Sequence, residues 1–166
     1  IIAAAGRDRE YRLNIKGEEF AYTWIDYLRN HKKSKLKNLR VAVVGGGAVA
    51  LDAAVTAKLN GASNVEMFCL EKFDEMPLTD AERSLILKHG IEISGRVKVD
   101  SINGISKPEG KRINSIVTSK VILPPKEKFH PSKIKADKKS NPQTRQFDAV
   151  IIAIGSGSSL EVKKKK

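Results

Sequence analysis

The chain has 166 residues, of which 40% are hydrophobic and 30% charged, and its formal net charge is +12 at pH 7. This length suits one domain of ordinary size with its own core. The longest apolar runs, Val41 to Val44 and Ala149 to Ile154, are too short to span a bilayer, and the single cysteine, Cys69, excludes an internal disulfide or a CxxC pair. We see no secretory leader and expect a cytoplasmic protein.

Lysines dominate the charge and gather in three clusters, at residues 32–37, 126–139 and 163–166. A charge of this size attracts polyanions. Aromatic residues are few and do not alternate with the lysines, so the sequence lacks the stacking surface that single-strand binders use. We interpret the clusters as a solvated surface, with an acidic partner or nucleic acid as the alternative.

The first part of the chain, residues 1–38, differs from the rest. Ile1 to Gly6 is apolar and ends in glycine, as short buried strands do. Glu18 to Asn30 carries large apolar residues at helical spacing, which predicts an amphipathic helix that docks on another element. We expect Trp24 of this helix to pack in the core.

Residues 39–93 alternate between strand and helix patterns. Strands are predicted at Leu39–Val44, Val65–Leu70 and Ile91–Ile93, and helices at Ala48–Leu59 and Thr79–Lys88. Thr79 and Glu82 have capping-box spacing at the start of the second helix, and Gly90 provides its C-terminal stop. Alternating strands and helices imply a parallel sheet.

The pattern changes after residue 96. Val97–Ile105 and Arg112–Leu123 alternate around a turn cluster, so we expect an antiparallel meander in place of a crossover helix. The Lys- and Pro-rich segment 124–146 is predicted to be a long exposed loop. Phe147–Ile154 is a last buried strand, and residues 156–166 form a tail. The predicted fold class is α/β, a Rossmann-like three-layer domain whose parallel sheet carries an antiparallel β-meander crossover.

A glycine-rich motif follows the first of these strands and opens a helix, which is the context of a dinucleotide-binding fingerprint. The residues that fit G-x-G-x-x-A are Gly45, Gly46, Gly47, Ala48, Val49 and Ala50. Gly45 permits a tight turn, Gly47 lets a pyrophosphate approach the backbone, and Ala50 permits close packing. The N–H groups of Gly47, Ala48 and Val49 favour a phosphate at the helix N-terminus. The alternative is a glycine-rich turn without a ligand.

The residues after the second predicted strand bear on the cofactor. Glu71 lies about twenty residues after the motif, where an acidic residue contacts the ribose hydroxyls of NAD. A carboxylate there would repel the 2′-phosphate of NADP, whereas the positive charge of the neighbouring Lys72 would attract it. We therefore favour NAD(H) over NADP(H), with an ordinary exposed charge as the alternative role of Glu71.

Other reactive residue types give no site. His31, His89 and His130 lack the paired spacing of metal ligands, and Cys69 is interpreted as a buried small hydrophobe. Asp52, on the first helix of the motif, fits a position facing the cofactor and a solvated position equally well. We assign no catalytic residue and no metal ligand.

Four segments occur in an informative order: Ala21–Leu28, Val41–Ala54, Asp74–Pro77 and Phe147–Gly155. This order resembles the NADPH-binding part of the glutamate synthase small subunit and its relatives. The relatives include the amino-terminal part of dihydropyrimidine dehydrogenase and similar FAD- and iron–sulfur-linked oxidoreductases. The resemblance covers nearly the whole chain apart from residues 124–146.

The resemblance implies that residues 39–155 form an NAD(P)H-binding domain inserted in an FAD domain, with residues 1–38 as hinge strand and linking helix. Gly155 ends the strand that leads back to the flavin domain, and we include it among the cofactor-binding residues. The domain would present nicotinamide for hydride transfer to a flavin that this chain does not hold. The implied partners are that flavin domain and an iron–sulfur or glutamate synthase-type subunit, so we expect this chain alone to be catalytically incomplete.

Three positions depart from the family. The family has asparagine where Ala48 stands and a pair of arginines where Leu70 and Glu71 stand. Arginines there would bind a 2′-phosphate by charge-assisted hydrogen bonds, so their replacement agrees with a preference for NAD. A non-catalytic module that binds an acidic partner or nucleic acid through its lysine clusters remains the alternative function.

Overall fold

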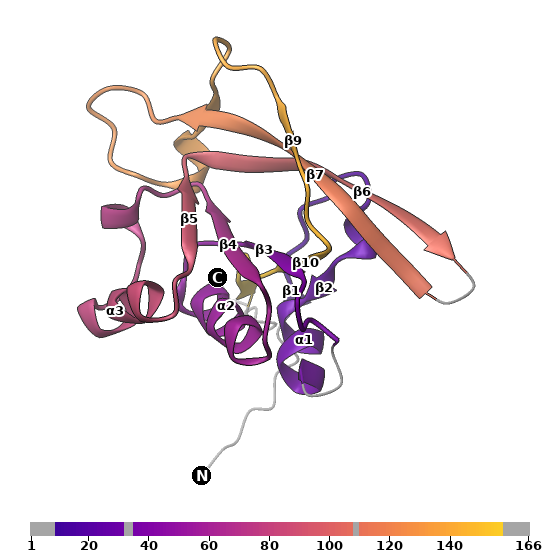
Figure 1. Cartoon of the computed structure of the whole chain (residues 1–166). Helices are drawn as coiled ribbons and strands as arrows, with labels where there is room; N and C mark the ends of the chain where they lie inside the picture. The colour runs from indigo at the N-terminus through magenta and orange to yellow at the C-terminus, as the bar shows by residue number, and fades with distance from the viewer. Residues whose placement is uncertain (1–8, 32–34, 108–109, 158–166) are drawn as a thin grey trace, which may run out of the picture.

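The computed structural model describes residues 9–31, 35–107 and 110–157. A parallel sheet lies at its centre, in the order β2 (Tyr22–Thr23), β10 (Ala149–Ile152), β3 (Arg40–Val44), β4 (Asn64–Cys69) and β5 (Glu92–Gly95). One face is covered by α1 (Trp24–Asn30), α2 (Ala48–Leu59) and α3 (Asp80–Lys88), and the antiparallel β6 (Val97–Lys107) and β7 (Gly110–Ile122) cross the other (Figure 1). The three layers confirm the predicted Rossmann-like α/β fold with its meander crossover.

Both faces of the sheet are buried, because its central strands are almost entirely apolar. Along β3, Val41 and Val43 belong to the core cluster on the helix side, whereas Ala42 and Val44 belong to the cluster on the meander side.

No helix among the described residues is long and apolar enough to cross a membrane.

The helices α2 and α3 lie where the sequence predicts them. α2 spans Ala48–Leu59 and buries four alanines completely, which lets it lie close to the sheet. At the start of α3, the Thr79 hydroxyl accepts from the Glu82 N–H (3.3 Å) and the Glu82 carboxylate accepts from the Thr79 N–H (2.7 Å). Gly90 follows the helix with φ +59°, a left-handed conformation that suits glycine.

The helix predicted over Glu18–Asn30 is wrong in its first part. Residues Glu18–Phe20 form the 3₁₀ turn η1, and Tyr22–Thr23 form β2, which pairs with β10. α1 begins only at Trp24, where the Thr23 side chain caps it by accepting from the Asp26 N–H (3.2 Å). The open edge of β10 offers backbone partners that helical spacing cannot reveal. Trp24 packs against the helix-side core, as predicted.

The ends of the described chain meet in a small antiparallel pair. β1 (Arg9–Glu10) pairs with β11 (Ser156–Gly157). The strand predicted at residues 1–6 lies outside the described residues, as does most of the predicted tail.

The segment 124–146 is mostly exposed, as predicted, but it is not a loop throughout. It contains the 3₁₀ turn η4 (Pro131–Lys133) and two short strands, β8 (Lys135–Ala136) and β9 (Gln143–Arg145). Both strands pair antiparallel with β7 and so extend the meander layer. Their short, polar sequences carry no strand pattern, so their formation depends on the edges that β7 offers.

An ion pair joins the amino ends of β3 and β10. The Arg40 guanidinium donates to both carboxylate oxygens of Asp148 (2.9 and 3.0 Å), and the Arg40 backbone N–H donates to one of them (2.9 Å). These hydrogen bonds hold the pKa of Asp148 below its ordinary value.

We expect Asp148→Asn to lower the free energy of unfolding by about 1 kcal/mol at pH 7, a modest figure because the pair is partly exposed to water. The folded pKa lies below the unfolded value of about 4. The stabilisation is therefore present above that pH and disappears as the pH falls through the folded pKa. Urea unfolding at several pH values would measure this, with Asp52→Asn, at an exposed position on α2, as control. If the variant and the wild type still differed as much in their free energy of unfolding at low pH, this prediction would be wrong.

Candidate functional site

The strand order creates a switch point between β3 and β10. From β3 the chain moves outward through β4 to β5, and it later returns to place β10 on the other side of β3. In open parallel sheets, the crevice outside the carboxyl ends of the strands at such a point receives ligands. The predicted glycine turn, residues 45–47, lies at this point, between the end of β3 and the start of α2.

Gly45 makes the turn. Its φ is +143°, a conformation that side chains rarely adopt. A Cβ on Gly45 would lie 2.2 Å from the carbonyl oxygen of Ala153, just beyond β10, and 3.1 Å from the Cβ of Ala50. The close approach of two strands and a helix at this corner therefore depends on Gly45 and the small Ala50.

Gly47 leaves the N-terminus of α2 open. It is the N-cap residue in an extended conformation (φ −95°, ψ −179°), and no side chain caps the helix there. The helical ladder starts with the Leu51 N–H donating to the Gly47 carbonyl (3.1 Å), so the N–H groups of residues 48–50 precede it. A Cβ on Gly47 would meet only the Cγ of Pro77, at 4.0 Å. Such a free helix start suits an anion.

Glu71 reaches the turn from the end of β4. Its Oε2 lies 2.7 Å from the position that a Cβ on Gly46 would take, so the carboxylate stands directly beside the glycine turn. Lys72 follows with an exposed side chain, and its backbone N–H donates to Glu75 Oε2 (2.9 Å). The fold therefore brings together residues 45–50 and Glu71, whereas the neighbouring Lys72 is exposed.

Gly155 lies on the other side of the turn, two residues beyond Ala153. Its φ is +93°, and its carbonyl accepts from the Tyr11 N–H (3.3 Å), which joins it to the segment that follows β1. Gly155 thus shares the carboxyl edge of the sheet with the glycine turn.

A pocket of about 260 Å³ lies beyond β10. Its lining includes Thr23, Trp24 and Ile152 together with Tyr11. Ile152 pairs in register with both Thr23 and Val44, so the pocket lies at the level where β3 ends, on the side of the turn opposite to Glu71. A long ligand that crosses the glycine turn from Glu71 would extend toward this pocket.

Cys69 is unsuited to redox chemistry. It is the last residue of β4, buried on the helix side, and burial raises the pKa of its thiol to about 12. The thiolate is the reactive form of cysteine, so the side chain behaves as the small hydrophobe that the sequence predicts. The described residues include no group of three or more His, Cys, Asp or Glu side chains that could hold a metal ion.

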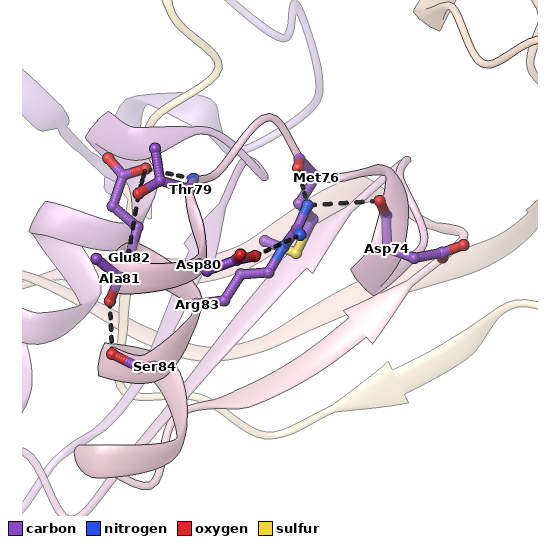
Figure 2. A network of polar contacts seen from close by, with 8 residues as sticks. All are labelled: Asp74, Met76, Thr79, Asp80, Ala81, Glu82, Arg83 and Ser84. Carbon is purple, nitrogen blue, oxygen red and sulfur yellow. Dashed lines mark hydrogen bonds and ion pairs between the residues drawn. The ribbon is translucent and has the colours of Figure 1, made fainter.

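Arg83, which sequence reasoning missed, anchors the loop between β4 and α3. From the first turns of α3, its Nη2 donates to the carbonyls of Met76 (2.9 Å) and Asp74 (3.4 Å), as Figure 2 shows. This fixes the residues just before Pro77, which borders the open side of Gly47.

Arg96 was also missed. It follows β5 directly, and its side chain donates to Leu70 and Glu75 on either side of Glu71. The strand predicted there ends at Ile93, and no local pattern in the sequence marks the contacts that Arg96 makes.

Comparison with known proteins finds solved structures that share this fold. No curated protein matches the chain. Thioredoxin reductases are among the similar solved structures: those of T. acidophilum (18% identity, TM-score 0.65, 90% of this chain and 42% of that one), Lactococcus lactis in its FR conformation (17%, 0.66, 90% and 42%) and Gloeobacter violaceus (18%, 0.61, 91% and 40%).

At these identities the likeness shows the fold alone, and the chain spans about two-fifths of the length of those structures. The sequence pattern of one family extends over residues 1–155, almost the entire chain. The cofactors used in that family are a pyridine nucleotide and a flavin. The chain belongs to the pyridine nucleotide-disulphide oxidoreductase family.

Proposed function

We propose that this chain binds NAD(P)H at the switch point and presents its nicotinamide to a flavin held elsewhere in the parent protein. The observation that carries the proposal is the open N-terminus of α2, where free N–H groups follow a glycine turn that no side chain caps. A diphosphate needs such a group of donors and the positive end of a helix dipole.

The surroundings of the turn divide the site into two halves. Glu71 stands on the β4 side, where its carboxylate would accept hydrogen bonds from the adenosine ribose. Gly155 and the pocket at Trp24 lie on the β10 side, which is left for the nicotinamide half. Bound NAD(P)H would supply a hydride for the flavin. This transfer needs positioning rather than an acid–base pair, and we therefore assign no catalytic residue.

The preferred cofactor in this proposal is NAD(H). The carboxylate of Glu71, beside the glycine turn, would repel a 2′-phosphate, and the charge of the exposed Lys72 would be screened by water and compensate less. We expect NADH to bind at least about tenfold more tightly than NADPH, which corresponds to about 1.4 kcal/mol of discrimination.

The partners in this proposal are the flavin domain of the parent chain and an iron–sulfur or glutamate synthase-type subunit, in the cytoplasm. The resemblance to the glutamate synthase small subunit supports this choice over disulfide reduction. The chain has one cysteine, and its thiol is buried with a raised pKa, so dithiol exchange cannot take place within this chain.

Titration of NADH and NADPH into the purified chain tests the proposal, and Gly47→Ala is the decisive variant. Alanine accepts the extended conformation of Gly47, and the N-cap change should cost no more than about 1 kcal/mol of stability. Its methyl group would occupy the space through which a diphosphate approaches. We expect both cofactors to bind at least about tenfold more weakly, a loss within the range for a displaced charge-assisted contact.

Gly90→Ala is the matched control, because Gly90 lies after α3 with open space around it. Its φ of +59° makes alanine destabilising there, but binding should not change. Absence of saturable binding of either cofactor to the wild type at millimolar concentration would refute the proposal.

A second candidate function rests on the exposed lysines of residues 126–139, which could bind an acidic partner or nucleic acid. Retention on heparin or DNA above about 0.2 M salt would favour it, because phosphate-driven contacts weaken steeply with salt.

A further inference from the structure

Arg96 adopts a backbone conformation that is rare for a large side chain. Its φ is +56°, in the left-handed region, at the step from β5 into β6. Such conformations persist where the surroundings hold the residue in place, and they concentrate at functional positions. The Arg96 side chain is 15% exposed, so most of the guanidinium is enclosed by protein.

The contacts of Arg96 converge on the residues around Glu71. Its Nη1 donates to the Leu70 carbonyl (2.6 Å), and its backbone N–H donates to the Glu71 carbonyl (3.2 Å). Its Nη2 donates to Oε1 of the Glu75 carboxylate (2.7 Å). The other oxygen of that carboxylate, Oε2, accepts from the Lys72 N–H. The backbone is therefore held before, at and after Glu71, while the Glu71 side chain extends to the glycine turn.

Gly95 makes this arrangement possible. A Cβ on Gly95 would lie 2.7 Å from the Glu71 carbonyl oxygen, so the glycine lets the end of β5 approach that carbonyl closely. The guanidinium also lies over the ring of Phe129, whose centroid is 5.3 Å from Arg96 Cζ. Phe129 belongs to the Lys- and Pro-rich segment, which thereby contacts the supports of the candidate site.

From this geometry we infer that Arg96 is a positioning residue that sets the discrimination between NADH and NADPH by fixing Glu71, and that Phe129 supports it from the segment 124–146. The inference rests on the proposed function. Two nitrogens of Arg96 already donate to Leu70 and Glu75, so its role is to hold the loop and not to bind a 2′-phosphate.

The test measures the dissociation constants of NADH and NADPH for the full 166-residue chain by calorimetry. Arg96→Met keeps an apolar stem but removes the donors, so Glu71 loses its fixed position. We expect the preference for NADH to fall about fivefold in Arg96→Met and about twofold in Phe129→Leu, as expected for residues coupled through one network. Arg40→Met, which removes an arginine from the opposite edge of the sheet, should leave the preference unchanged.

A double-mutant cycle separates positioning from general stability. Once Glu71→Gln has removed the carboxylate, adding Arg96→Met should change the NADH preference no further. Additive effects of the two changes, or an unchanged preference in Arg96→Met, would overturn the inference while leaving the proposed function intact.

An increased preference for NADH in Arg96→Met would also overturn the inference, because it would identify Arg96 as a ligand of the 2′-phosphate. If Arg96→Met does not fold, as judged by circular dichroism, Phe129→Leu and its combination with Glu71→Gln provide the same test. No saturable binding to the wild type would instead remove the proposed function, and this inference with it.

Discussion

Replacing Gly45 with alanine is expected to destabilise the protein by about 3 to 5 kcal/mol, combining backbone strain with overpacking. The new Cβ would lie 2.2 Å from the carbonyl oxygen of Ala153 and 2.9 Å from its carbonyl carbon. Both are backbone atoms next to β10, where the Ala153 N–H donates to the Val44 carbonyl (2.8 Å), so they cannot rotate away. The φ of +143° adds strain of its own. Urea unfolding of the two proteins would measure the loss.

Gly47→Ala is the control for this prediction. It adds the same methyl group two residues further along the turn, where the nearest neighbour of a Cβ would be Pro77 Cγ at 4.0 Å. We expect it to weaken nucleotide binding with little loss of stability, whereas Gly45→Ala should weaken folding itself. Equal losses of stability in the two variants would show that the turn is not built as described.

Much of this fold could be predicted because its signals are local. The buried strand, the glycine turn and the alanine-rich helix α2 follow one another within residues 39–59, and each is determined by near neighbours in the sequence. The capping box of Thr79 and Glu82 is local as well, and it placed the start of α3 correctly. The position of Glu71 beside the turn also follows from spacing, since the end of β4 must lie next to the end of β3.

The rest depended on contacts between distant residues. β2 replaces the first turns of a predicted helix because β10, more than a hundred residues later, offers an edge for pairing. The strands β8 and β9 form on β7 despite their polar sequences. The left-handed conformation of Arg96 and its hold on Glu71 have no local signature, because the groups that fix it come from the loop after β4 and from Phe129.

A buried ion pair is the clearest contact of this kind. Glu66, in the middle of β4, faces the meander and is 3% exposed. Arg145 of β9 donates to its two carboxylate oxygens (2.5 and 2.7 Å), and the Ser94 hydroxyl donates to one of them (2.5 Å). The guanidinium also lies over the rings of Phe68 and Phe147, at 5.2 and 5.8 Å from their centroids. The pair thus fastens the meander layer to the sheet.

We expect Glu66→Gln to lower the free energy of unfolding by about 3 kcal/mol, because it leaves the Arg145 charge without its counterion next to an apolar layer. The figure lies at the low end for buried pairs, since the Arg145 side chain is 36% exposed and can gain some hydration.

The double variant Glu66→Leu/Arg145→Met should recover most of this loss, because an apolar pair of similar size needs no counterion. Urea unfolding of the three proteins would measure both effects. If Glu66→Gln lowered the free energy of unfolding by less than about 1 kcal/mol, the pair would contribute no more than a surface ion pair does. The attachment of the meander would then depend on its apolar contacts, chiefly those of Ile102 and Ile116 with the sheet, and not on this ion pair.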